Sequence, residues 1–234
     1  MKYKKQLHIK KKAQILAFIP ARKGSSRIKN KNIILFNKKP LIYYSIYSAI
    51  KSKYITDTVV YSNSDKIKIL SKKFGANTNF NRPHNVSRNN TTMYQTIKYF
   101  LKKNLRFKNF DYLLLLQPTS PLRSYIDINK SIRKLFKNSK ADGIISTFRV
   151  KKLKSVYPEK FMIENNGYLR VIKKNKIKSY KNLYLRNGPA IFLIKIKSLK
   201  AKMYNIKLLN YVMSEKKSLD INNVHDLKNF NYRL

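Results

Sequence analysis

Short apolar runs alternate along the chain with segments whose apolar residues recur at helical spacing. Five runs have the length and flanks of buried strands, at residues 15–19, 58–61, 112–117, 143–148 and 190–194. Helical spacing, together with residues typical of helix ends, predicts helices over 41–53, 65–74, 91–101, 124–136 and 198–204. Strands alternating with helices predict an α/β fold, with a mostly parallel sheet covered by helices on both faces.

Residues 151–181 interrupt this alternation. The segment is polar, and weakly alternating stretches flank the turn residues Asn165-Asn166-Gly167. Asn-Gly between alternating stretches is typical of a tight hairpin turn, so we predict a β-hairpin inserted between two core strands, in a place suited to a subunit contact. Residues 1–12 carry positive charge without periodicity and predict a basic, solvated tail, which leaves 13–234 as a single domain.

Composition limits the class of protein. A chain of 234 residues can bury a core of its own, and none of its apolar runs approaches the roughly 18 residues of a membrane span. The absence of cysteine excludes disulfides, thiolate metal sites and cysteine nucleophiles. Because the basic N-terminus lacks the apolar segment of a signal peptide, we expect a cytoplasmic protein with no membrane partner.

The net charge is extreme. The chain has 53 Lys and Arg against 10 Asp and Glu, a net charge of +43, which is typical of proteins that bind polyanions. However, 42 of these cations are Lys, spread over almost every exposed stretch, whereas nucleic-acid recognition favours Arg. We interpret the charge as compositional bias. It predicts non-specific polyanion binding at low salt but no specific nucleic-acid partner.

The loop after the first strand, residues 20–32, is a candidate site because ligands of open α/β sheets bind beyond the carboxyl ends of the strands. It combines Gly24 with two serines and five cations. Small residues allow close backbone approach, and hydrogen-bond donors with positive charge suit a polyphosphate. An ordinary lysine-rich surface loop remains the alternative.

Two further features carry candidate chemistry. The segment 117–123, QPTSPLR, follows the central strand, and its polar side chains between two prolines suit a base or a sugar hydroxyl, although a rigid turn before a helix explains the same residues. No two of the ten carboxylates have a compact metal-ligand spacing. Asp220, between apolar neighbours in SLDIN, is the best single candidate for Mg²⁺.

Five segments in order resemble the CMP-sialic acid synthetases, also called acylneuraminate cytidylyltransferases. They are IPARKGSSRIKNKNI at 19–33, Arg82-Pro83, LLLLQPTSPLR at 113–123, RNGPAI at 186–191 and SLDI at 218–221. The resemblance covers about residues 13–227 and implies a Rossmann-like nucleotidyltransferase fold. It implies that the anomeric hydroxyl of an acidic nine-carbon sugar, a nonulosonic acid, attacks the α-phosphate of CTP with Mg²⁺ and releases pyrophosphate. It also implies a homodimer that uses the 151–181 region.

The resemblance implies roles for individual residues. Those implied to bind the nucleotide are Arg22, Gly24, Ser25, Arg27, Lys31, Asn32 and Arg82. Those implied to bind the sugar are Gln117, Thr119, Ser120, Arg186, Asn187 and Gly188. The metal ligands would be Asp220 and Asn222, and Asp220 would act in catalysis with Arg22 and Lys31.

The chain also departs from the family pattern. Ser26 stands where the family usually has Lys, and Asn222 replaces the second carboxylate of an Asp-Ile-Asp sequence. Acidic positions of the family are Asn63, Asn89 and Gln95 here. Two other functions therefore stay open: a degenerate homologue that binds nucleotide or sugar with weak or no turnover, and, less favoured, a charge-driven nucleic-acid binder.

Overall fold

The computed structural model describes residues 13–24, 28–150, 160–172, 174–180, 182–188, 190–223 and 225–227. The predicted tail 1–12, the predicted site residues Ser25 and Arg27, and residues 151–159 of the predicted insertion lie outside them. The division into a tail and a single domain stays a prediction.

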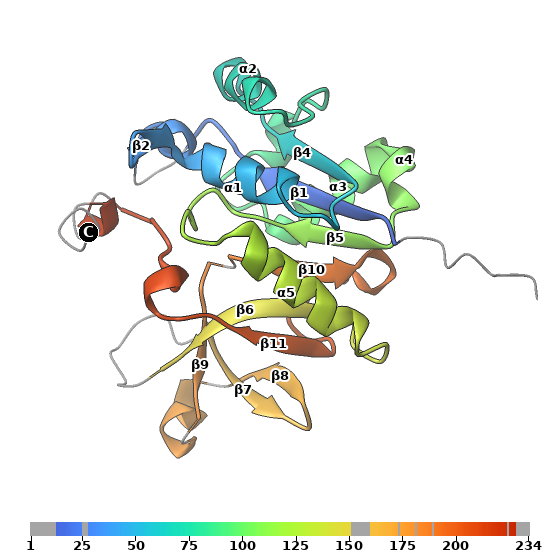
Figure 1. Cartoon of the computed structure of the whole chain (residues 1–234), viewed down its shortest axis with the longest axis vertical. Helices are drawn as coiled ribbons and strands as arrows, with labels where there is room; N and C mark the ends of the chain where they lie inside the picture. The colour runs from blue at the N-terminus through green and yellow to red at the C-terminus, as the bar shows by residue number, and fades with distance from the viewer. Residues whose placement is uncertain are drawn as a thin grey trace, which may run out of the picture.

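Strands of a nine-stranded sheet form the centre of the molecule, in the order β11-β8-β7-β9-β6-β10-β5-β1-β4 (Figure 1). The strands are β1 (Ile15–Pro20), β4 (Asp57–Tyr61), β5 (Tyr112–Leu115), β6 (Gly143–Arg149), β7 (Phe161–Asn165), β8 (Tyr168–Val171), β9 (Tyr184–Arg186), β10 (Phe192–Lys195) and β11 (Leu208–Val212). Two short strands, β2 (Leu35–Phe36) and β3 (Lys39–Pro40), pair separately.

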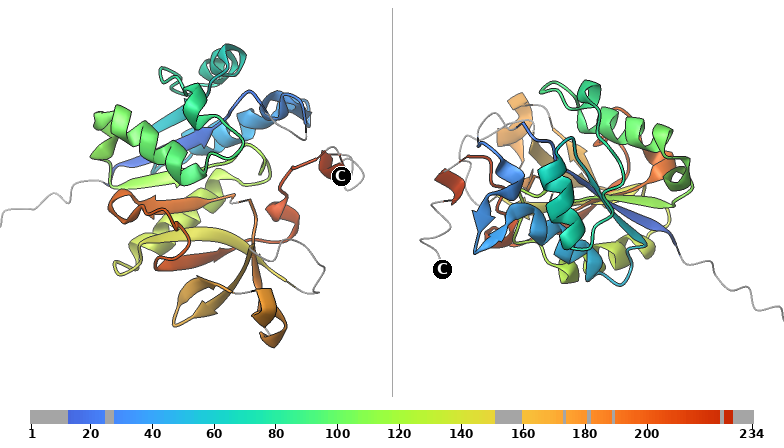
Figure 2. Two further views of the ribbon diagram at one scale, coloured as in Figure 1. Left: turned by 180° about the vertical axis from the view of Figure 1, so that it is seen from behind. Right: turned by 90° about the horizontal axis from the view of Figure 1, so that it is seen from above.

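Helices cover both faces of this sheet, as predicted. They are α1 (Leu41–Ile50), α2 (Asp65–Lys73), α3 (Met93–Lys103), α4 (Leu105–Lys108) and α5 (Tyr125–Phe136). Alternate residues of β1 explain the layers: Ile15, Ala17 and Ile19 pack in one cluster with α1 and α5, whereas Leu16 and Phe18 pack in another with α3 and α4. The opposite views in Figures 1 and 2 show these two layers, with α1 and α5 on one face and α3 and α4 on the other.

The predominance of parallel strands is a prediction that the structure corrects. β1 runs parallel to β4 and β5, and β6 runs parallel to β11, but β10 is antiparallel to both β5 and β6. β9 is also antiparallel to β6, along the same edge as β10, since Val150 N–H donates to the carbonyl of Leu183 and Ser146 N–H to that of Ile191, whereas β11 bonds the opposite edge through Thr147. An apolar run that is buried on both faces suits a parallel and an antiparallel strand equally well. The sequence pattern therefore could not show that β10 runs antiparallel to its neighbours.

The predicted hairpin is confirmed, but the predicted last helix is wrong. β7 and β8 pair across Asn166 and Gly167, whose φ angles of 48° and 76° suit the tight turn expected from Asn-Gly. Residues 198–204 form no α-helix: a 3-10 turn, η5 (Ile196–Ser198), leads into an irregular loop. Met203 and Tyr204 still pack against the core cluster, so the apolar spacing indicated burial rather than helix.

Candidate functional site

Three loops surround a cavity of about 390 Å³ at the carboxyl ends of β1 and β5. The residues lining it are Pro20, Arg22, Gly24, Lys31, Asn32, Arg82, Arg88, Asn89, Thr91, Met93, Gln117, Pro118 and Thr119. They come from the predicted loop after β1, from the loop that precedes α3, and from the segment after β5. The position agrees with the rule that ligands bind at this edge of an α/β sheet.

The loop after β1 is held by its own polar residues. Asn32 Nδ2 donates to the carbonyl oxygen of Arg22 at 3.0 Å, which fixes the two ends of the loop against each other. Arg22 Nη1 donates to Asn89 Oδ1 at 2.7 Å and to the carbonyl of Ser87 at 3.2 Å. Arg22 therefore joins this loop to the one before α3.

Arg82 is the most buried cation of the cavity, at 6% exposure. Its Nε and Nη2 donate to the carbonyl of Val86, and Nη2 also donates to Thr96 Oγ1. Burial, with the nearby charge of Arg22, lowers the pKa of Arg82 to about 10, so it is still positive at neutral pH.

The cavity is strongly positive. Its wall contains four cations, Arg22, Lys31, Arg82 and Arg88, and no Asp or Glu is among the described residues that line it. A partly enclosed cavity with charge of one sign concentrates ligands of the opposite sign. A polyphosphate is the natural ligand for this wall.

Asp220 lies behind Thr119, on the wall next to the cavity. The backbone N–H of Ile221 donates to the carbonyl of Thr119 at 2.8 Å, and Lys31 Nζ donates to the carbonyl of Ile221 at 3.3 Å. These two bonds tie the segment that carries Asp220 to both strand-end loops. Figure 1 shows the chain after β11 returning toward the blue segment around β2.

Gly188 lies against both Ser120 and Asp220. A Cβ atom at Gly188, whose φ is +110°, would lie 2.9 Å from Ser120 Oγ and 3.2 Å from Asp220 Cγ. Ser120 Oγ in turn donates to the carbonyl of Asn187 at 3.4 Å. The predicted residues Ser120, Gly188 and Asp220 thus form one contact group beside the cavity.

The carboxylate of Asp220 can accept a cation. Its Oδ1 is buried without a hydrogen-bond partner, whereas Oδ2 accepts a hydrogen bond from Asn222 Nδ2 at 2.9 Å. A buried carboxylate oxygen without a partner is costly, and Mg²⁺ would satisfy it. No group of three or more acidic, His or Cys residues lies together in the described ranges, so substrate oxygens and water would complete the coordination. Asn222 turns its amide nitrogen toward Asp220, and its role as a ligand stays a prediction.

Four of the six predicted sugar-binding residues are not among those lining the cavity: Ser120, Arg186, Asn187 and Gly188. Asn187 is buried, with Oδ1 accepting from Ser146 Oγ at 2.6 Å and Nδ2 donating to Ser218 Oγ at 3.0 Å. It therefore anchors the segment that leads to Asp220. The guanidinium carbon of Arg186 lies 3.9 Å from the ring centroid of Tyr204. Sugar contacts by Arg186 and Asn187 stay predictions.

Sequence reasoning identified Arg82 in the loop before α3 but missed other residues of this loop that line the cavity. Arg88, Thr91 and Met93 line the cavity although no predicted strand ends directly before them. The loop reaches the sheet edge because Arg82 N–H donates to the carbonyl of Ser62, just after β4. Arg82-Pro83 was the available signal for this segment.

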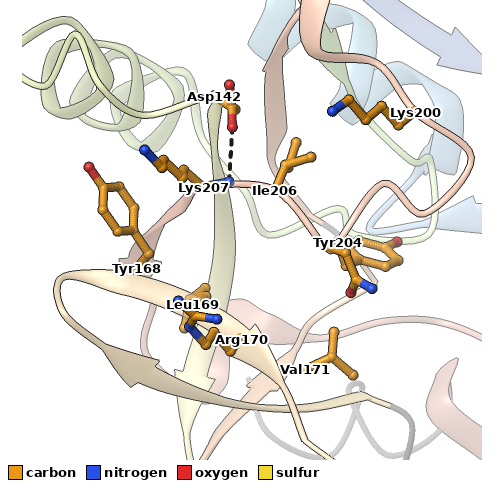
Figure 3. Close-up of a pocket in the computed structure, with 10 residues that line it drawn as sticks. Asp142, Tyr168, Leu169, Arg170, Val171, Lys200, Tyr204, Ile206 and Lys207 are labelled. Carbon is orange, nitrogen blue, oxygen red and sulfur yellow. Dashed lines mark hydrogen bonds between the residues drawn. The ribbon is translucent and has the colours of Figure 1, made fainter.

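A separate pocket of about 560 Å³ lies at the amino ends of β6 and β11 (Figure 3). The β7–β8 hairpin and the loop over 200–207 line it. Asp142 has its oxygens occupied there, because Oδ2 accepts from the backbone of Lys207 and Oδ1 from Ser198 Oγ. None of the predicted site residues lines this pocket.

Comparison with known proteins decides the family. The profile of the cytidylyltransferase family matches residues 16–229, which is nearly the whole chain. The chain belongs to the cytidylyltransferase family. The resemblance found in the sequence motifs is thereby confirmed.

Several curated proteins are similar in sequence to this chain. It is 26% identical over 221 residues to an N-acylneuraminate cytidylyltransferase of Escherichia coli, which covers 93% of this chain and 51% of the relative. It is 37% identical over 111 residues to a CMP-N,N'-diacetyllegionaminic acid synthase of Legionella pneumophila, covering 47% of this chain and 48% of the relative. A pseudaminic acid cytidylyltransferase of Campylobacter jejuni is 34% identical over 126 residues, with 53% of each chain covered. The chain spans about half the length of these relatives.

Solved structures support the fold. A CMP:2-keto-3-deoxy-manno-octonic acid synthetase complexed with CTP superposes with a TM-score of 0.75 at 12% identity, covering 94% of this chain and 98% of that one. A 4-diphosphocytidyl-2C-methyl-D-erythritol synthase gives a TM-score of 0.63 at 13% identity, with 94% and 98% covered. The predicted nucleotidyltransferase α/β fold is confirmed at this level. Across the described residues, no helix combines the length and apolar character needed to cross a bilayer.

Proposed function

We propose that this chain is a CTP-dependent cytidylyltransferase that activates a nonulosonic acid as its CMP derivative. One observation carries the proposal: a cavity with four cations and no lining carboxylate lies next to Asp220, whose buried Oδ1 has no partner. The negative charge of a triphosphate complements the four cations. A metal ion bound to that triphosphate would be ligated by the Asp220 carboxylate. The named relatives act on N-acylneuraminate or pseudaminic acid or make a CMP-legionaminic acid, which supports the class of sugar.

In this proposal the residues of the chain bind and orient, and they take no covalent part. Arg22, Lys31 and Arg82 neutralise the phosphates, with the Gly24 backbone beside them and Asn32 holding the loop. Mg²⁺, held by Asp220, would supply further positive charge at the phosphates. Positioning and charge neutralisation can provide most of the catalysis of in-line phosphoryl or nucleotidyl transfer.

The segment after β5 would orient the sugar. Gln117 and Thr119 line the cavity on the side nearer to Asp220. From there the anomeric hydroxyl would attack the α-phosphorus, the bond to the β-phosphate would break, and pyrophosphate would leave. No Asp, Glu or His is among the described residues that line the cavity, so the hydroxyl proton would pass to solvent.

A pyrophosphate-release assay tests this function. The full chain is incubated with CTP, MgCl₂ and, in turn, N-acetylneuraminic, legionaminic, pseudaminic and 3-deoxy-manno-octulosonic acid. We expect release with at least one of the first three acids, none without sugar, and loss of release when EDTA removes the metal. Silence with every acid would overturn the proposal.

A second candidate is a homologue that binds CTP without turnover. It is favoured by Asn222, which occupies Asp220 Oδ2 as a hydrogen-bond donor where the family pattern has a second carboxylate. Calorimetric CTP binding without pyrophosphate release, together with turnover restored by Asn222→Asp, would support this candidate against the first.

The proposed enzyme would be a homodimer that uses the 151–181 region. The support is the resemblance together with the hairpin β7–β8, which projects beyond the helices in Figure 1. Light scattering after size exclusion tests it: a monomer at micromolar concentration would contradict the dimer.

A further inference from the structure

Arg123, at the end of the QPTSPLR segment, has one of the largest fully buried side chains of the described residues, at 2% exposure. Its guanidinium contacts main-chain oxygens instead of a carboxylate. Nη1 lies 3.0 Å from the carbonyl oxygen of Ala190, 3.3 Å from that of Ser120 and 3.4 Å from that of Gln117. Nη2 donates to Ser45 Oγ of α1 at 2.7 Å.

These oxygens belong to two different walls of the site. Gln117 lines the cavity, and Ser120 packs against Gly188, which also lies against Asp220. Ala190 begins the chain's entry into β10, two residues after Gly188. A single guanidinium thus holds the loop after β5 against the segment that leads into β10.

Helix α1 fixes Arg123 from the other side. Ser45 Oγ also donates to the carbonyl of Gln117 at 3.1 Å, and Ser48 Oγ donates to the carbonyl of Arg123 at 3.0 Å. Both serines are buried on the face of α1 that meets the sheet. Their positions explain why this otherwise apolar helix face carries two hydroxyls.

Burying the charged guanidinium of Arg123 costs free energy, which its hydrogen bonds must offset. Burial penalises its charge and lowers the pKa of Arg123 to about 9. An apolar residue of similar volume would fill the space without that penalty, but it would leave three carbonyls without this donor. Only a planar fork with several N–H groups can reach acceptors on separate segments at once.

We propose that Arg123 is a positioning residue that sets the spacing between the Gln117–Ser120 loop and the Gly188–Asp220 group. It would act through the sugar-orienting wall and the metal ligand, without touching substrate. The proposal rests on the proposed function, in which the Gln117–Ser120 loop orients the sugar and Asp220 holds the metal that binds the triphosphate.

The test compares Arg123→Lys and Arg123→Met with Arg133→Lys, an exposed arginine on α5 that serves as a matched control. In the pyrophosphate assay we expect kcat to fall about 10- to 100-fold in both Arg123 variants, since a displacement on the order of 1 Å can cost that much. The KM for CTP should change less than about threefold, because the cations of the loop after β1 are untouched. Normal kcat per folded molecule would show that Arg123 only stabilises the fold, and would overturn the proposal.

Hydrogen exchange gives a readout that does not need turnover. In Arg123→Lys, peptides covering 117–122, 190–194 and 218–222 should exchange faster, while β4 should match the wild type. Exchange that is faster throughout the chain, or unchanged in all of these peptides, would overturn the proposal. If the wild type releases no pyrophosphate, the proposed function fails, yet this comparison still decides the positioning role.

If neither Arg123 variant folds, Ser45→Ala replaces them. It removes the acceptor of Nη2 and one donor to Gln117 while the guanidinium stays in place. We expect the same local increase in exchange and a smaller fall in kcat. Unchanged exchange at 117–122 would again contradict the proposal.

Discussion

Replacing Gly188 by alanine should damage both stability and activity, for two separable reasons. Its φ of +110° is a conformation that residues with a Cβ rarely adopt, at a cost of about 1 to 3 kcal/mol. The new methyl would also lie 2.9 Å from Ser120 Oγ and 3.2 Å from Asp220 Cγ. Ser120 is fully buried, so overpacking adds about 1 to 3 kcal/mol.

The combined cost, about 4 kcal/mol at the middle of these ranges, predicts a fall in Tm of roughly 8 to 16 °C for a chain of this size. Relief of the contact would push the Asp220 carboxylate away from the cavity wall, and we expect kcat to fall about 100-fold. Circular dichroism melting and pyrophosphate release with saturating CTP and sugar measure the two effects.

Gly167→Ala is the matched control. Gly167 also has a positive φ, +76°, but no atom lies within 4 Å of a Cβ built there. Only the backbone strain applies, about 1 to 2 kcal/mol, so Tm should fall by a few degrees and activity should be unchanged. If Gly188→Ala and Gly167→Ala lose the same stability and both stay active, the contact of Gly188 with Asp220 does not matter, and this reasoning fails.

Three further perturbations follow from the structure. Asp220→Asn should lower kcat by more than about 100-fold with little change in Tm, since a neutral amide binds Mg²⁺ poorly; a fully active variant would contradict the metal-ligand role. Burial raises the pKa of Asp127, but hydrogen bonds from Ser124 and the charge of Lys217 outweigh it and hold this pKa below its usual value. The stability that Asp127 contributes is thus fully present above about pH 4 and lost as pH falls through the lower folded pKa, so the Tm deficit of Asp127→Asn at pH 7 should shrink below pH 4. Random-sequence DNA should bind at low salt and be released by physiological ionic strength; tight, sequence-selective binding there would contradict the compositional interpretation of the charge.

The sequence by itself determined which segments are buried and where cations gather beyond the end of the first strand. The apolar runs predict β1 and β5, Asn166-Gly167 predicts the hairpin turn, and the composition of the cation-rich loop after β1 predicts a site there. These features are local. Hydrophobic periodicity and turn chemistry act over a few residues, so they can be recognised without knowledge of the rest of the chain.

Only the tertiary structure decided how distant segments meet. The direction of β10 depends on the path of the chain after β6, and an apolar run packs equally well in either direction. The contact of Ser120, Gly188 and Asp220 needs three separate segments to reach one edge of the sheet. The burial of Arg123 depends on carbonyl groups from those same segments. Such arrangements are set by packing over long separations in sequence, which no local pattern of side chains records.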